Sequence, residues 1–127
     1  MVMCSTNYLV FGEGKGSEPF DVPLSQNGVQ RVDIIVDSYL FKPDHIIVSV
    51  DKPVEITLIS VTRLISHNFI LNIPEAGLSI KKGVGAGKDV TFTFIPTKTG
   101  KYEFYCGKKG LFGSHRKKGM EGILEVK

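Results

Sequence analysis

The sequence predicts an all-β domain, a Greek-key β-sandwich or barrel of seven to eight antiparallel strands. Short runs of β-branched and aromatic residues recur from residue 31 onward, with Pro and Gly residues between them. Apolar and polar residues alternate in the clearest runs, as in strands with one face on a core and the other in water. No segment shows the sustained spacing of apolar residues that is typical of a helix.

Residues 1–30 are rich in Gly, Ser, Asn and Pro, and we expect an irregular arm there that either stays separate or adds an edge strand. Glycines alternate at positions 12, 14 and 16, but a phosphate-binding loop would open a helix, and no helical spacing follows. The arm also contains Cys4. A lipid-modified Cys4 is a weak alternative, because Val2 and Met3 differ from the small residues that lipoprotein cleavage prefers.

The predicted β-domain covers residues 31–127. Its first strands are expected at 31–37, 45–50, 54–61 and 67–71, which are runs rich in Val, Ile and aromatic residues. The later strands are expected at 89–95, 101–106 and 122–126, with the clearest alternation in 90–94 and 102–104. Turns are expected at 51–53, at 96–100 and along the glycines at 83, 85 and 87.

Length and composition fit one domain. The chain has 127 residues, of which 42% are hydrophobic, so it can bury a core without disulfides. No apolar run approaches the ~20 residues of a membrane span. The first six residues lack the features of a secretory signal. The protein is therefore cytoplasmic or has lost a targeting segment, and we expect the second, because Met1 reads as a start codon before a mature or truncated sequence.

The most informative residues are one thiol, two imidazoles and one thioether, namely Cys106, His67, His115 and Met120. Thiolate and thioether sulfur suit Cu(I), while imidazole suits both Cu(I) and Cu(II). A ligand set that serves both oxidation states lets one electron pass with little rearrangement. The four residues therefore predict a trigonal copper site with a weak axial sulfur.

Each of these residues also has a purely structural explanation. His67 lies beside Phe69 and would be a half-buried strand histidine, Cys106 a core thiol, and Met120 a core filler. All three coincidences together are improbable. A disulfide between Cys4 and Cys106 is disfavoured because Cys106 is better explained as a ligand. For His45, which has no soft partner nearby in the sequence, a surface role is expected.

The order and flanks of these residues resemble the cupredoxins, the family of small blue copper proteins. The matching segments are Phe41-Lys42-Pro43, Ser66-His67-Asn68-Phe69, residues 99–106 and residues 115–122. The resemblance implies a β-sandwich that holds one copper ion, as Cu(I) or Cu(II), in the periplasm or another extracytoplasmic space.

The resemblance also implies a role for each site residue. His67 and His115 would be the imidazole ligands, Cys106 the thiolate and Met120 the long axial ligand. Asn68 would tie the two ligand loops together near the cysteine sulfur, and the carbonyl of Ser66 would lie opposite Met120.

One feature departs from the family pattern. Cupredoxins usually place two to four residues between the cysteine and the next histidine, whereas eight residues separate Cys106 from His115. Doubling a loop costs only ~0.6 kcal/mol, so the insertion is compatible with a site, but it leaves open how tightly the site is fixed. The two-copper domain of terminal oxidases has a second cysteine in this loop, and position 110 here is Gly. Red copper sites use a carboxylate and no methionine, and Met120 argues against one.

The ligand loop is basic. Between Glu103 and Glu121 the chain has no acidic residue and five cations, which are Lys108, Lys109, Arg116, Lys117 and Lys118. The net charge of the whole chain is only +3. The five cations are either an ordinary solvated surface or a collar that, with Leu111 and Phe112, attracts an acidic partner. Nucleic acid is a poor fit, because stacking aromatics and a recognised binding motif are missing.

We therefore predict a mononuclear copper protein, a monomer, that carries single electrons between redox proteins. Its partner would be a cytochrome or an oxidase with an acidic surface. We do not expect an enzyme, because four protein ligands leave no open position for a substrate. Two alternatives stay open: a delivery or storage protein that holds Cu(I), and a metal-free interaction module.

Overall fold

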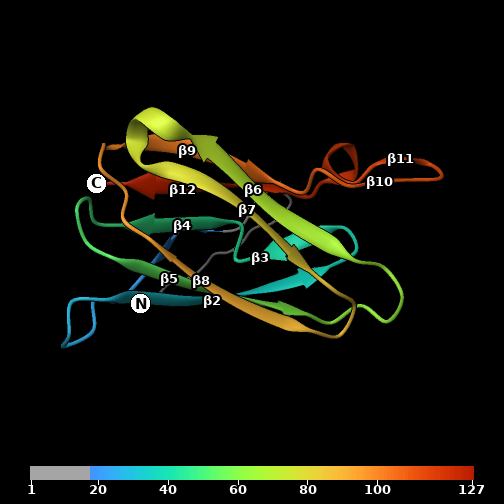
Figure 1. Cartoon of the computed structure of the whole chain (residues 1–127), viewed down its shortest axis with the longest axis horizontal. Helices are drawn as coiled ribbons and strands as arrows, with labels where there is room; N and C mark the ends of the chain where they lie inside the picture. The colour runs from blue at the N-terminus through green and yellow to red at the C-terminus, as the bar shows by residue number, and fades with distance from the viewer. Residues whose placement is uncertain (1–17) are drawn as a thin grey trace, which may run out of the picture.

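The computed structural model describes residues 18–127 as two β-sheets packed face to face (Figure 1). Cys4 and the alternating glycines of the arm lie outside the described residues. Along the part of the chain that is described, no helix has both the length and the apolar character needed to cross a membrane. The predicted all-β sandwich is confirmed.

The larger sheet has six strands in the spatial order β1-β4-β12-β9-β6-β7. Their bounds are β1 Phe20–Asp21, β4 His45–Val48, β12 Glu121–Val126, β9 Gly100–Tyr105, β6 His67–Ile73 and β7 Leu78–Val84. The smaller sheet has four strands in the order β3-β2-β5-β8. Their bounds are β3 Leu40–Lys42, β2 Gln30–Asp37, β5 Val54–Ser60 and β8 Asp89–Phe94.

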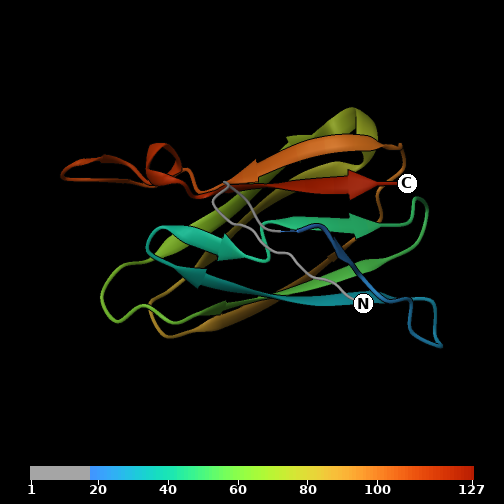
Figure 2. The ribbon, with the colours of Figure 1, turned by 180° about the vertical axis from the view of Figure 1, so that it is seen from behind.

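Three short elements complete the described chain. A two-stranded hairpin joins β10 (Lys109–Gly110) to β11 (Gly113–Ser114), and it extends from one end of the sandwich (Figure 2). Two 3₁₀ turns, η2 (Pro74–Ala76) and η3 (Arg116–Lys118), follow β6 and β11. The left-handed backbone of Gly77 and Gly119 ends these turns, with φ of 75° and 116°.

All seven predicted strands are present, each with ends within two residues of the prediction. β1 is an edge strand contributed by the arm, one of the two possibilities expected for it, whereas β3, β7 and the hairpin were not predicted. Among residues 18–127 the two sheets together therefore hold ten strands. The expected glycine turn is wrong at Gly83, which lies inside β7 and pairs with Asn68 of β6. Only Leu78, Ile80 and Val84 of β7 are buried, and its other residues are a serine, two lysines and a glycine. Its ladder with β6 outweighs that weak local preference.

The expectation of antiparallel pairing is also only partly right. β2 pairs with β5, β12 with β4, and β1 with β4 in parallel. Parallel neighbours require a crossover connection of a dozen or more residues. The segment between β2 and β5 provides one, because it leaves the smaller sheet, forms β4 in the larger sheet and then returns.

The core lies between the two sheets and follows the predicted alternation. In β5, Val54, Ile56 and Leu58 point inward and are fully buried, while the residues between them are partly exposed. Phe69 and Phe104 of the larger sheet are also fully buried and stack with ring centroids 4.6 Å apart. Truncating such a buried phenylalanine to alanine costs about 3–5 kcal/mol.

These aromatic strands also position the ends of the ligand segments. β6 and β9 are antiparallel neighbours, so the start of β6 and the end of β9 lie at the same end of the sheet. His67 is the first residue of β6, and Cys106 directly follows β9. Gly122, at the start of β12, has no space for a Cβ, which would collide with the Phe104 ring and the carbonyl of Asp44. The fold therefore brings the two segments together around a tightly packed core.

Candidate metal centre

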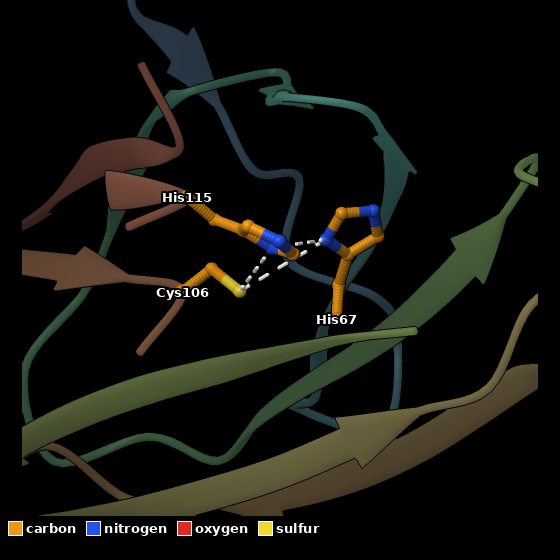
Figure 3. Close-up of side chains that lie close together, drawn as sticks. All are labelled: His67, Cys106 and His115. Atoms are coloured by element: carbon orange, nitrogen blue, oxygen red, sulfur yellow. Dashed lines mark hydrogen bonds between the residues drawn. The ribbon is translucent and has the colours of Figure 1, made fainter. Parts of the chain in front are cut away.

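Three of the predicted ligands meet in one buried group (Figure 3). The ligand atoms of His67, Cys106 and His115 all lie within 4.8 Å of one another, and all three residues are buried. The two histidine Nδ1 atoms are 3.1 Å apart. The Cys106 Sγ lies 3.6 Å from the His115 Nδ1 and 3.9 Å from the His67 Nδ1. A thiol and two imidazole nitrogens thus form a nearly regular triangle.

The size of this triangle suits a single metal ion. Bonds of about 2.0–2.1 Å to nitrogen and about 2.3 Å to sulfur, the values known for zinc, put two nitrogen ligands about 3.3–3.6 Å apart and nitrogen and sulfur about 3.6–3.8 Å apart. The observed 3.1, 3.6 and 3.9 Å are close to these separations. Two Nδ1 lone pairs at 3.1 Å repel each other unless a proton or a cation lies between them. The donor set therefore fits a metal ion.

Burial keeps both imidazoles in the form that binds metal. Desolvation by burial is the larger cause, and the neighbouring His115 the second, of a lowered pKa of about 4 for His67. Desolvation is also the largest cause of the lowered pKa of His115, and the positive charges of Lys118 and Lys108 lower it further. A metal needs an unprotonated nitrogen. Both rings are therefore neutral at neutral pH, and each has one nitrogen with a lone pair to offer.

Asn68 links the histidine segment to the cysteine segment. Its Oδ1 accepts a hydrogen bond of 2.7 Å from the backbone N–H of Gly107, and its own backbone N–H points at the Cys106 Sγ, 3.4 Å away. A donor at this sulfur stabilises the thiolate. A Cβ at Gly107 would lie 2.6 Å from the Ile70 Cδ1, so the isoleucine side chain would have to shift to make room for it.

The long segment between Cys106 and His115 is a closed hairpin. Lys109 and Gly110 pair with Ser114 and Gly113, and the backbone N–H of His115 donates to the Lys108 carbonyl at 2.9 Å. The two ends of the insertion are therefore adjacent, as the ends of a short loop would be. This geometry explains how eight intervening residues remain compatible with a compact site.

Met120 lies next to the group on the same returning segment. The η3 turn follows His115, and the Met120 N–H donates to the His115 carbonyl at 3.2 Å. The Met120 carbonyl accepts from the Cys106 N–H at 3.1 Å, and its side chain is fully buried. Ser66 directly precedes β6 and is exposed, and its carbonyl role remains a prediction. His45 pairs with Glu125 at 3.0 Å, outside this group.

The basic loop is not uniform. Arg116 is held by Glu103 at 2.7 Å and by Glu121 at 3.1 Å, and its guanidinium lies 4.1 Å from the centre of the Tyr105 ring. This arginine therefore belongs to the sheet surface, whereas the four lysines of the loop are exposed. The hairpin tip exposes two large apolar side chains, Leu111 at 90% and Phe112 at 83%.

Two residues at the group were not predicted from the sequence, namely Ser38 and Tyr39, which connect β2 to β3. The Ser38 Oγ lies 3.3 Å from the His67 Nε2, and the Tyr39 ring centre lies 4.9 Å from that of His115. Neither residue belongs to a recognisable motif, and each lies far from its histidine in the sequence. Only the folded chain brings these side chains to the site.

Comparison with known proteins agrees with this description. A sequence profile described as the cupredoxin-like domain matches residues 11–120. No curated protein matches the chain. One similar solved structure is the Cu(I)-bound metal-binding domain of the Cu(I)-exporting P-type ATPase CopA of Streptococcus pneumoniae D39. It is 24% identical with a TM-score of 0.62, and the match covers 87% of this chain and 96% of that domain.

Two further solved structures are similar in fold. Dithionite-reduced auracyanin from the photosynthetic bacterium Roseiflexus castenholzii is 18% identical with a TM-score of 0.64, and the match covers 76% of this chain and 96% of auracyanin. A mutant plastocyanin of fern is 26% identical with a TM-score of 0.53, and the match covers 76% of this chain and 100% of plastocyanin. Because the family profile spans most of the sequence and the fold agrees with it, this chain belongs to the cupredoxin-like family.

Proposed function

We propose that the protein is a single-electron carrier that holds one copper ion through the His67 Nδ1, the Cys106 Sγ and the His115 Nδ1, with Met120 as a weak axial ligand. The observation that carries the proposal is the buried triangle of two imidazole nitrogens and one thiol sulfur, at separations that suit one ion. Thiolate, thioether and imidazole together serve both Cu(I) and Cu(II). Bound there, copper would supply the one-electron redox chemistry.

The surroundings of the group favour electron transfer over catalysis. β6, β9 and the η3 turn fix the ligand backbones, so the ligands have little freedom to rearrange when the charge of the site changes. Four protein ligands in a buried position leave no open site for a substrate, whereas catalytic metal sites generally keep one. A carrier role therefore fits better than an enzymatic role.

The partner that best fits this end of the molecule is an acidic redox protein, such as a cytochrome or an oxidase, in an extracytoplasmic space. The exposed Leu111 and Phe112 offer an apolar contact, and the same loop carries exposed lysines at 108, 109 and 117. Such a surface speeds encounter with a negatively charged partner by long-range attraction.

Copper loading of the purified protein tests the ligation. Cu(II)-loaded protein should absorb strongly in the visible through thiolate-to-copper charge transfer, and Cys106→Ala should abolish the band while circular dichroism shows an intact sandwich. Asn72→Ala, on an exposed position of β6 away from the group, is a control that should keep the band. A colourless Cu(II) protein, or colour that survives Cys106→Ala, would contradict the proposed ligands.

Copper delivery or storage is the second candidate. The similarity in fold to the metal-binding domain of a Cu(I) exporter favours it, although that similarity concerns the fold alone. A carrier should exchange electrons reversibly and keep its metal, whereas a delivery protein should pass Cu(I) to a metal-free acceptor. Cyclic voltammetry combined with a copper-transfer assay separates the two roles, and a chain that binds no copper at all would be an interaction module.

A further inference from the structure

The connection between β2 and β3 contacts both imidazoles of the metal centre. The Ser38 Oγ lies 3.3 Å from the His67 Nε2, the nitrogen on the far side of that ring from the triangle. The Tyr39 ring packs on His115 with centroids 4.9 Å apart and an angle of 60° between the planes. The same tyrosine meets His67 edge to face, with centroids 6.2 Å apart. One two-residue segment thus contacts the two histidines that the sequence places 48 residues apart.

Ser38 is placed to select the useful tautomer of His67. A neutral imidazole has its proton on one nitrogen, and a hydrogen bond at that nitrogen decides which one. When the His67 Nε2–H donates to the Ser38 Oγ, the lone pair remains on Nδ1, the atom that faces Cys106 and His115. The Ser38 backbone N–H in turn donates to the Asp37 Oδ1 at 2.8 Å, which helps to hold the turn in place.

Tyr39 is placed to hold the His115 ring and to cover it. His115 is only 5% exposed although it follows an exposed hairpin. The Lys118 Nζ lies 4.6 Å from the centre of the same Tyr39 ring, a distance typical of a cation–π contact. The Tyr39 carbonyl also lies against Gly119, where a Cβ would approach it to 3.4 Å. The tyrosine therefore contacts both imidazoles and a lysine of the basic ligand loop.

We propose that Ser38 and Tyr39 form a wall on one side of the metal centre. In this wall Ser38 sets the tautomer of His67, while Tyr39 orients His115 and keeps water and competing ligands away from the bound ion. Both are positioning residues, since each acts through a histidine. The inference rests on the proposed function for the identity of the ion and of its ligands. Groups that orient a metal ligand typically change metal affinity 10–100-fold when they are removed.

The first experiment needs no metal. In nitrogen-15 NMR spectra of the metal-free protein, His67 should be mainly the Nε2–H tautomer, and Ser38→Ala should reduce that population. Ser38→Thr, which keeps a hydroxyl group, should restore it. Equal tautomer populations in the original protein and in Ser38→Ala would overturn the role of Ser38, whatever the metal proves to be.

The second experiment uses copper-loaded protein. Tyr39→Leu should transfer Cu(I) to the chelator bathocuproine disulfonate about 10-fold faster than the original protein, because the ring no longer covers His115. It should also lower the reduction potential, because water that enters the site stabilises the more highly charged Cu(II) state. Tyr39→Phe keeps the ring and should behave like the original protein, as should Leu40→Ala, an exposed neighbour in β3.

These outcomes separate the wall from the ligation itself. If the original protein lacks the charge-transfer band, the proposed function fails, while the tautomer experiment still tests the Ser38 contact. If the band is present but Tyr39→Leu matches Leu40→Ala in both transfer rate and potential, the wall is wrong and the ligands stand.

Discussion

Each histidine of the metal centre is tuned by what surrounds its ring. Because burial disfavours a charged imidazole, the folded protein holds the His67 pKa at about 4, against about 6.5 in an unfolded chain. Between these two values the unfolded state binds more protons than the folded state. The free energy of unfolding of the metal-free protein must therefore fall as pH is lowered through this window, and level off below it.

The shift in His67 should contribute about 3 kcal/mol of this loss between pH 6.5 and pH 4, and the lowered pKa of His115 adds to it. Urea denaturation of the metal-free protein at a series of pH values measures it. His67→Gln removes the titrating group but keeps a polar side chain, so its stability should depend less on pH over the same window. Identical pH profiles for the two proteins would show that His67 does not titrate as its burial requires.

The role of Met120, as axial ligand or packing residue, can be tested with a single substitution. Its side chain is fully buried, and leucine has a similar volume, so Met120→Leu should cost less than ~1.5 kcal/mol of stability. If Met120 is an axial ligand, the substitution should preserve copper binding through three ligands and raise the reduction potential, because losing a donor destabilises Cu(II) more than Cu(I). Voltammetry decides the question, since an unchanged potential would make Met120 a packing residue only.

The four candidate ligands could be predicted from the sequence because soft sulfur and imidazole groups are rare and their chemistry is specific. Ser38 and Tyr39 could not, since serine and tyrosine have many ordinary uses in turns. Ser38 contacts His67, 29 positions away in the sequence, and Tyr39 contacts His115, 76 positions away. These contacts form only once β2, β6 and the η3 segment are packed together.

Among the strands and turns, local pattern predicted most of the sandwich. β5 and β8 alternate clearly between buried and exposed positions, and a period of two is the strongest signal that a strand can carry. β3 is only three residues long, and β7 contains adjacent lysines followed by a glycine. Both depend on pairing with a neighbouring strand, which no local window contains.

We expect the β10–β11 hairpin to separate two roles that a short loop would combine, namely holding the metal ligands and contacting a partner. Its stem closes with the hydrogen bond from the His115 N–H to the Lys108 carbonyl, so we expect the candidate ligands to be positioned by the stem rather than by the tip. Replacing residues 109–114 with Asn-Gly leaves a two-residue turn between that bonded pair, a connection that hairpins favour. The shortened protein should keep its charge-transfer band and its reduction potential, both measurable after copper loading, while its association with an acidic partner should slow.

A matched control is Leu111→Ser with Phe112→Ser, which keeps the length of the hairpin and removes only its apolar tip. If the shortened protein fails to bind copper while this control binds it, the hairpin is part of the metal site rather than a separate contact surface.

Considered as a whole, the described part of the molecule has its three most exposed large apolar side chains at the end that holds the candidate metal centre. The β10–β11 hairpin and the connection from β5 to β6 lie at the same end (Figures 1 and 2). The hairpin exposes Leu111 and Phe112, and the connection exposes Leu64 at 92%. With a net charge of only +3, the local density of lysine rather than the total charge must determine any attraction to a partner.

This asymmetry gives a prediction with an internal control. Lys109→Glu with Lys117→Glu reverses two exposed charges at the ligand end, while Lys52→Glu with Lys98→Glu reverses two exposed charges in turns at the other end of the sandwich. Each reversal changes the charge by two, so both double variants have the same formal net charge of −1. Lys118 is left intact because it contacts Tyr39.

Electron transfer to an acidic redox protein, followed by stopped flow, should slow much more in the first variant than in the second. The effect should appear in the association rate more than in dissociation, because charges around a contact mainly steer the encounter. It should also shrink as salt is added, since the Debye length is only ~8 Å at physiological ionic strength. Equal rates for the two variants would mean that net charge alone governs the encounter. That result would contradict the proposal that the ligand end is the docking surface.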